Sequence, residues 1–132
     1  MMAMRLAISE AARRLATAEC RLVFSDFVAK NGHTMQQTLD AKGENPRSYL
    51  RWLIFQNASA EGVCRRTDVV AATTPGSRII LVCAKRFVEA QFLSGGYAAT
   101  LVIHEELHSL GLGEDPPSSR EITLKVIARC GS

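Results

Sequence analysis

The chain has few aromatic residues, no tract of low complexity, no internal repeat and no apolar run of transmembrane length. Neither a membrane-spanning protein nor a repeat architecture is therefore expected. The net charge of +3 is spread thinly, and adjacent arginines occur only at Arg13-Arg14 and Arg65-Arg66. With 6% aromatic residues, this pattern does not favour a nucleic-acid-binding surface. We expect neither a nucleic-acid partner nor a membrane partner.

The remaining composition, with 47% hydrophobic and 22% charged residues, is that of an ordinary globular protein. A chain of 132 residues is long enough for a hydrophobic core and too short for a separate regulatory module. We therefore expect residues 1–132 to form a single domain.

The four cysteines contain no CxxC pair of the kind that a structural zinc site uses. Their even number and wide spacing predict two disulfides, and three pairings are possible. We favour Cys64 with Cys83, which would join neighbouring strands, and Cys20 with Cys130, which would join the two ends. The alternative is four reduced, buried thiols in a cytosolic protein.

Disulfides indicate an oxidising compartment. Charged residues interrupt residues 1–20, so this segment has no apolar core of a signal peptide. We expect a secreted or periplasmic protein, of which this chain is a mature or truncated form.

The segment His104-Glu105-Glu106-Leu107-His108 has the pattern HExxH. Positions i and i+4 lie on one face of a helix, so the two imidazoles can converge on one Zn²⁺. Zn²⁺ lowers the pKa of water from roughly 15.7 to about 7, and a nearby carboxylate can take the proton during attack. His104 and His108 are therefore candidate metal ligands, and Glu105 is the candidate general base. The helix itself should be buried, because apolar residues surround the motif: Ala98, Ala99, Leu101, Val102, Ile103, Leu107 and Leu110.

Gly111 and Glu114 extend the pattern to HExxHxxGxxE, and residues 97–115 resemble the zincin metallopeptidases, in particular the metzincin-type extension. The resemblance implies that Gly111 lets the chain leave the helix and turn back, and that Glu114 is the third zinc ligand. Metzincins proper have histidine at that position and a methionine turn below the metal. This chain has glutamate there and no later methionine. Asp115 is the alternative third ligand.

A looser resemblance, to small bacterial metallopeptidase domains that usually occur in exported proteins, spans most of the chain. It rests on HEELHSLGLGEDPPSSREI, on the ending Ala128-Arg129-Cys130, and on residues 23–27 and 74–78. It implies a peptidase-like fold. Zincins commonly bind substrate as an extra strand along a sheet edge, which makes residues 78–83 our favoured rim. The apolar run in that segment is equally compatible with an interior strand.

Periodicity and capping signals predict an α+β fold, in which a small, mainly antiparallel sheet packs against the active-site helix and a C-terminal helix follows. The resemblance implies that this fold is zincin-like. We expect helices near residues 5–17, 34–40 and 85–92, a helix opening at Ser94 or Gly95, and a helix capped by Ser118 and Glu121 that runs to about Arg129. A short turn is expected near Ser48. We expect strands at 21–24, 50–55, 67–73 and 78–83, the last two forming a hairpin around Thr74-Pro75-Gly76-Ser77.

Four other residues stand out. His33 follows Asn31-Gly32 and is expected in a solvated turn. Tyr97 lies two helical turns before His104 and could stabilise an oxyanion, although core packing is favoured. Glu106 is expected to be solvated and Trp52 to fill the core.

Together these patterns predict a zinc-dependent hydrolase, a metallopeptidase that acts on a peptide or protein substrate. The alternative is a non-catalytic binding module that a metal stabilises.

Overall fold

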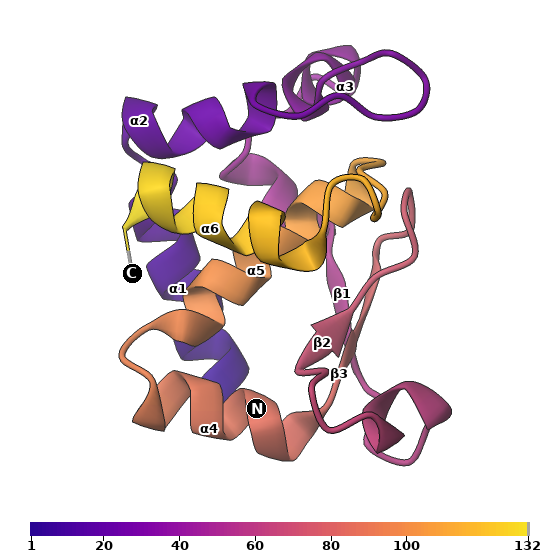
Figure 1. The fold of residues 1–132 in the computed structure, drawn as a ribbon. Helices are drawn as coiled ribbons and strands as arrows, with labels where there is room; N and C mark the ends of the chain where they lie inside the picture. The colour runs from indigo at the N-terminus through magenta and orange to yellow at the C-terminus, as the bar shows by residue number, and fades with distance from the viewer. Residues whose placement is uncertain (132) are drawn as a thin grey trace.

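The computed structural model describes residues 1–131 and belongs to the general α+β class, as expected (Figure 1). The α-helices are α1 (Met2–Arg14), α2 (Ala18–Arg21), α3 (Met35–Ala41), α4 (Ala84–Leu93), α5 (Tyr97–Ser109) and α6 (Ser119–Cys130). The strands are β1 (Ile54–Asn57), β2 (Ala71–Ala72) and β3 (Ile79–Val82). Short 3₁₀ helices are η1 (Leu22–Ser25), η2 (Ser48–Trp52) and η3 (Gly62–Arg65).

The sheet has the strand order β1-β3-β2. β2 and β3 form the expected antiparallel hairpin, with Ala71 opposite Val82. The longer pairing, between β1 and β3, is parallel and begins with Ile54 opposite Ile79. The expectation of a mainly antiparallel sheet is therefore wrong, because β2 lies within the connection that carries the chain from β1 back to β3.

The central place of β3 also overturns the expected rim at residues 78–83. β3 is hydrogen-bonded on both sides, and its alternate side chains Ile80 and Val82 are buried. The apolar run thus marks an interior strand. The two sheet edges belong to β1 and β2.

Two segments expected as strands are helical at least in part. Residues 21–24 lie in α2 and η1, where the Thr17 hydroxyl caps α2 by accepting from the Cys20 N–H. The segment 50–55 begins in η2 and becomes β1 only at Ile54. Val23 and Phe24 are buried side by side, and Leu50 and Leu53 are buried with two exposed residues between them. Neither pattern has the alternation of a half-buried strand.

Local capping signals correctly marked two helix starts. Thr34 and Gln37 form a capping box at α3, and Ser118 and Glu121 form one at α6. α1 and α4 occupy the expected regions. α5 begins after Gly96, which has φ +87°, one residue beyond the expected opening.

α5 is the centre of the molecule. It contacts α1, α4 and α6 as well as β2 and β3, and every residue from Ala98 to Ser109 is buried (Figure 1). Its start is fixed by Arg14 of α1, which is itself buried and donates to the Thr100 hydroxyl and the Gly96 carbonyl. The predicted buried helix is confirmed.

Both expected disulfides are present. Cys20–Cys130 joins α2 to the end of α6, and Cys64–Cys83 joins η3 to the residue before α4. Such bonds are typical of oxidising, extracellular compartments. Among residues 1–131, no helix is both long and apolar enough to cross a membrane.

Trp52 does not fill the core, contrary to expectation, because its side chain is 43% exposed. Its ring stacks on Tyr49 and lies beneath the Arg78 guanidinium, while its Nε1 donates to Glu44. The indole therefore covers one end of the sheet and does not enter the interior.

Candidate metal centre

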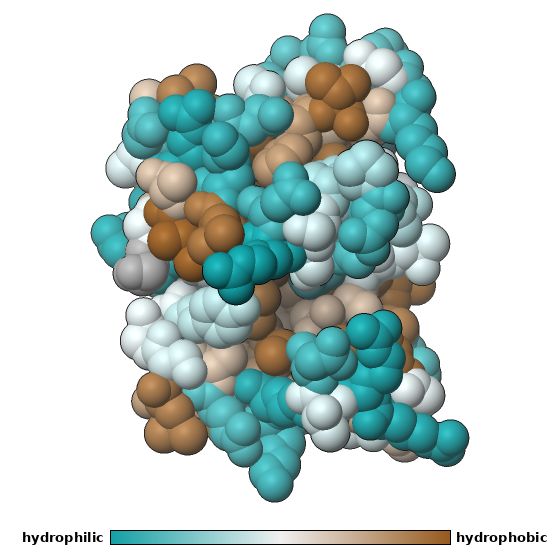
Figure 2. Space-filling model, viewed as in Figure 1, coloured by the Kyte–Doolittle hydropathy of each residue, from teal (hydrophilic) through white to brown (hydrophobic). Residues whose placement is uncertain are grey.

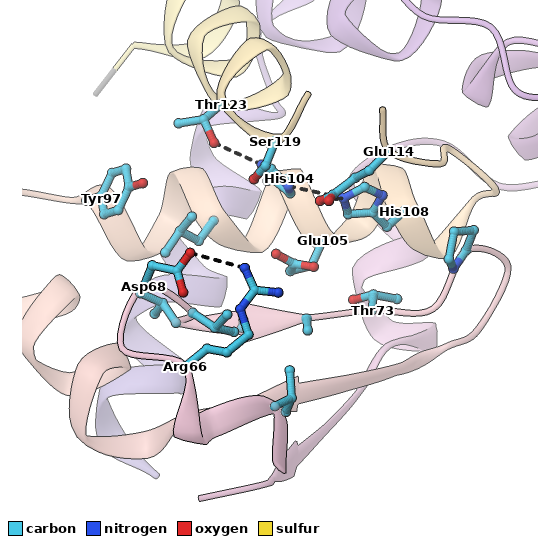
Figure 3. A pocket seen from close by; sticks show the side chains of 17 residues that line it. Arg66, Asp68, Thr73, Tyr97, His104, Glu105, His108, Glu114, Ser119 and Thr123 are labelled. Carbon is cyan, nitrogen blue, oxygen red and sulfur yellow. Dashed lines mark hydrogen bonds and ion pairs between the residues drawn. The ribbon is translucent and has the colours of Figure 1, made fainter. Parts of the chain in front are cut away.

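α5 and the turn after it bring His104, His108 and Glu114 together, with one donor atom of each within 4.8 Å of the others (Figure 3). Nε2 of His104 lies 3.1 Å from Nε2 of His108, and the latter lies 3.2 Å from Oε1 of Glu114. Two imidazoles and a carboxylate form a donor set that can hold a metal ion.

Local geometry explains this convergence. The two histidines lie one turn apart on one face of α5. The helix ends at Ser109, and two residues later Gly111 donates its N–H to the His108 carbonyl and has a φ of +112°, which suits a residue without Cβ. The chain then turns back and places Glu114 beside the rings. Asp115, the alternative ligand, is exposed and lies outside the cluster.

The second nitrogen of each ring has its own partner. Nδ1 of His108 lies 2.5 Å from the Leu112 carbonyl oxygen, which can only accept, so Nδ1 carries the proton. Nδ1 of His104 lies 2.9 Å from the Thr123 hydroxyl of α6. These contacts fix the rings and leave the Nε2 lone pair of His108 directed at the cluster.

The distances between the donor atoms show whether a cation fits between them. In neutral His108, the Nε2 lone pair faces a carboxylate oxygen at 3.2 Å, and this contact becomes favourable with either a proton on Nε2 or a cation between the two atoms. Two nitrogens bound to one tetrahedral zinc at about 2.0–2.1 Å would lie about 3.3 Å apart. The observed Nε2–Nε2 distance of 3.1 Å is close to that value. The residues therefore fit a small divalent metal ion.

Burial keeps His104 neutral. Burial and, to a smaller extent, the neighbouring His108 together lower the pKa of His104 to about 3. A neutral imidazole is the form that binds metal, so this residue needs no deprotonation near neutral pH.

Glu105 lies beside the cluster and is 4% exposed. The pKa of Glu105 is raised to about 8, mainly by burial; the hydroxyl of Thr73 opposes the rise and the charge of Glu114 contributes to it. Neither Glu105 Oε1 nor Thr73 Oγ1 has a hydrogen-bond partner of standard geometry among the described residues. Both groups border the cavity described next, where a polar ligand could satisfy them.

The cluster opens into a cavity of about 390 Å³ between α5, α6 and β2 (Figures 2 and 3). The edge strand β2 and Thr73 line one side, and Tyr97 lines the end away from Glu114. Arg66 and Asp68 line the cavity and form an exposed ion pair, with 3.2 Å between Nη2 of Arg66 and Oδ2 of Asp68. Tyr97 thus packs against the core, as expected, and also borders this cavity.

The expectation that the Glu106 side chain is solvated is wrong. It is 0% exposed, both of its carboxylate oxygens lack a partner among the described residues, and burial raises its pKa well above the usual value. Its position is about 200° around the helix from His104, away from the cavity, and α5 is covered there as well. A helix buried on all sides leaves no solvated face.

His33 lies in an exposed turn, where Gly32 has φ +84° and Asn31 Oδ1 accepts from the His33 N–H. It takes no part in the cluster.

The site also contains three groups that no spacing in the sequence had indicated: the side chains of Thr123 and Thr73 and the carbonyl of Leu112.

Comparison of the chain with known protein families, curated proteins and solved structures finds no match.

Proposed function

We propose that this protein is a zinc-dependent metallopeptidase with a zincin-like active site, and that it acts outside the cytosol. One observation carries the proposal. The His104, His108 and Glu114 cluster opens into the same cavity as a buried glutamate that has an unpartnered oxygen. A metal site without catalytic function has no need of such a carboxylate.

His104, His108 and Glu114 would hold the zinc. When bound, zinc supplies Lewis acidity toward water and toward a carbonyl oxygen. Glu105 is the candidate base, since it follows His104 directly and its carboxylate borders the cavity. A carboxylate with a raised pKa can accept a proton from the attacking water and return it to the leaving amine.

The edge strand β2 is the proposed rim for substrate. Ala71 and Ala72 line the cavity, and their small side chains leave room for an extended peptide beside them. Main-chain hydrogen bonds to such an edge hold a peptide whatever its side chains. This rim replaces the one expected at residues 78–83.

The test combines zinc analysis with hydrolysis of a peptide library by the wild type, Glu105→Gln and Glu89→Gln. Glu89 is exposed on α4 and provides a matched isosteric control. We expect about one zinc per chain in all three proteins. Hydrolysis should fall about 10²- to 10⁴-fold in Glu105→Gln alone, the range typical of a lost general base.

Two results would contradict the proposal. A wild-type protein that takes up no zinc has no metal site of this kind. Stoichiometric zinc without hydrolysis of any library member would favour the binding module, in which the metal only joins α5 to the turn after it.

A further inference from the structure

The outer edge of β1 is unpaired. β1 is a terminal strand of the sheet, and the N–H groups of Ile54 and Ala58 bond to β3-side carbonyls of Arg78 and Val82. Since backbone direction alternates along a strand, Phe55 and Asn57 direct their N–H and C=O groups away from β3. Among the described residues, no backbone group bonds to them. An edge of this kind is a template for another strand.

A hollow of about 580 Å³ adjoins this edge. Its apolar lining comes from α1, η2 and β1: Ile8, Ala12, Leu50, Leu53 and Phe55. No residue of β3 or β2 contributes, so β1 is the only strand that borders the hollow. It shares no lining residue with the metal cavity.

Two cationic side chains border the hollow. Arg47 and Arg51 are exposed and line it, and neither forms an ion pair within the described part of the chain. Glu44, the nearest acidic neighbour in sequence, is instead bonded to Ser48 and Trp52, and these bonds together with Arg51 lower its pKa. The hollow therefore combines an apolar floor with two guanidinium groups that have no carboxylate within ion-pair distance among the described residues and can bind one.

We propose that the β1 edge docks an extended, acidic peptide segment of a partner protein. The segment adds as a strand beside β1 and bonds to the backbone of Phe55 and Asn57. One apolar side chain enters the hollow, and flanking carboxylates pair with Arg47 and Arg51. Strand addition supplies affinity through the backbone, and the hollow and the two arginines supply selectivity. This docking requires neither zinc nor hydrolysis.

The test is a titration of the full chain with a terminally blocked peptide of alternating glutamate and leucine, followed by ¹H–¹⁵N correlation spectra. We expect shifts at the Phe55 and Asn57 amides, together with slower hydrogen exchange there. The variant R47E/R51E should bind the peptide about tenfold more weakly, as expected for two lost ion pairs. The control R65E/R120E has the same net charge, reverses exposed arginines elsewhere, and should bind as the wild type does.

Two further peptides separate strand addition from simple charge attraction. A lysine–leucine peptide should not bind, and a glutamate–leucine peptide N-methylated along one edge should lose binding. Equal binding of the N-methylated peptide would overturn strand addition at β1. Shifts confined to β2 and the metal cavity would overturn it too, since the peptide would then occupy the proposed substrate site. Absence of binding at millimolar peptide would also refute the proposal.

Discussion

Thr123 on α6 holds His104 on α5 through a 2.9 Å contact between its hydroxyl and Nδ1 of the ring. The ring is thereby oriented by a helix that follows the metal-binding motif in sequence. Partners of this kind fix the tautomer of a metal-binding histidine and the direction of its free lone pair.

Replacement of Thr123 by valine should therefore weaken zinc binding about 10- to 100-fold, the range typical for the loss of such a partner. Thr123→Ser keeps the hydroxyl and should retain most of the affinity. Competition with a chelator of known zinc affinity measures both variants. Equal loss in the serine and valine variants would indicate that packing of the methyl group matters and the hydroxyl does not.

Glu114→Ala should weaken zinc binding more than Thr123→Val does, because it removes a ligand and not only a ligand's support. Asp115→Ala should have little effect, since Asp115 lies outside the donor cluster. The two alanine variants differ by one position and serve as controls for each other. The same chelator competition decides the ranking, and the reverse order would transfer the third ligand to Asp115.

In the metal-free protein, Glu106 should lower the free energy of unfolding as the pH rises above 4.5, whereas His104, with its pKa lowered to about 3, acts in the opposite direction up to its ordinary value of 6.5. Burial raises the pKa of Glu106 in the folded state well above its ordinary value of 4.5. Above that pH the unfolded chain releases the proton that the folded chain keeps, so ionisation favours unfolding.

Glu106→Gln cannot ionise, and its free energy of unfolding should fall less between pH 5 and pH 8 than that of the wild type. Urea unfolding at several pH values measures the slopes, with Glu89→Gln as the exposed control. Glu105 contributes a decline of the same sign, because burial raises its pKa to about 8, and that decline should remain in Glu106→Gln. Parallel slopes for wild type and Glu106→Gln would show that Glu106 is ionised when buried.

Removal of the Cys20–Cys130 bond should destabilise the protein more than removal of Cys64–Cys83. The bonds span sequence separations of 110 and 19 residues, and the entropy lost by the unfolded chain grows with loop length. The chain-entropy relation gives about 5 and about 3 kcal/mol. Chemical denaturation of the two double-alanine variants measures the order, and a larger loss for the shorter loop would point to folded-state contacts as the main source.

The sequence predicted what depends on local chemistry. The capping boxes at Thr34 and Ser118 each act within one helical turn, and the spacing of His104 and His108 acts within α5. Even the disulfide pairing could be inferred, since one pair flanks the hairpin and the other lies near the chain ends.

The wrong predictions concern contacts between distant segments. Glu106 has the composition of a surface residue and lies in the interior, because other elements cover every side of α5. The parallel pairing of β1 with β3 and the place of Thr123 beside His104 also depend on the packing of separate elements. The periodicity or residue spacing of a single segment does not show which other segments pack against it.

The Cys20–Cys130 bond closes residues 20–130 into a covalent ring, and the sheet, α5 and the whole metal cluster lie within this ring. A single cut of the backbone anywhere in the ring leaves both pieces attached. A molecule cut once within the ring therefore stays in one covalent piece under non-reducing conditions, with the elements around the metal cluster still joined. Such a ring suits a protein that is exposed to proteases.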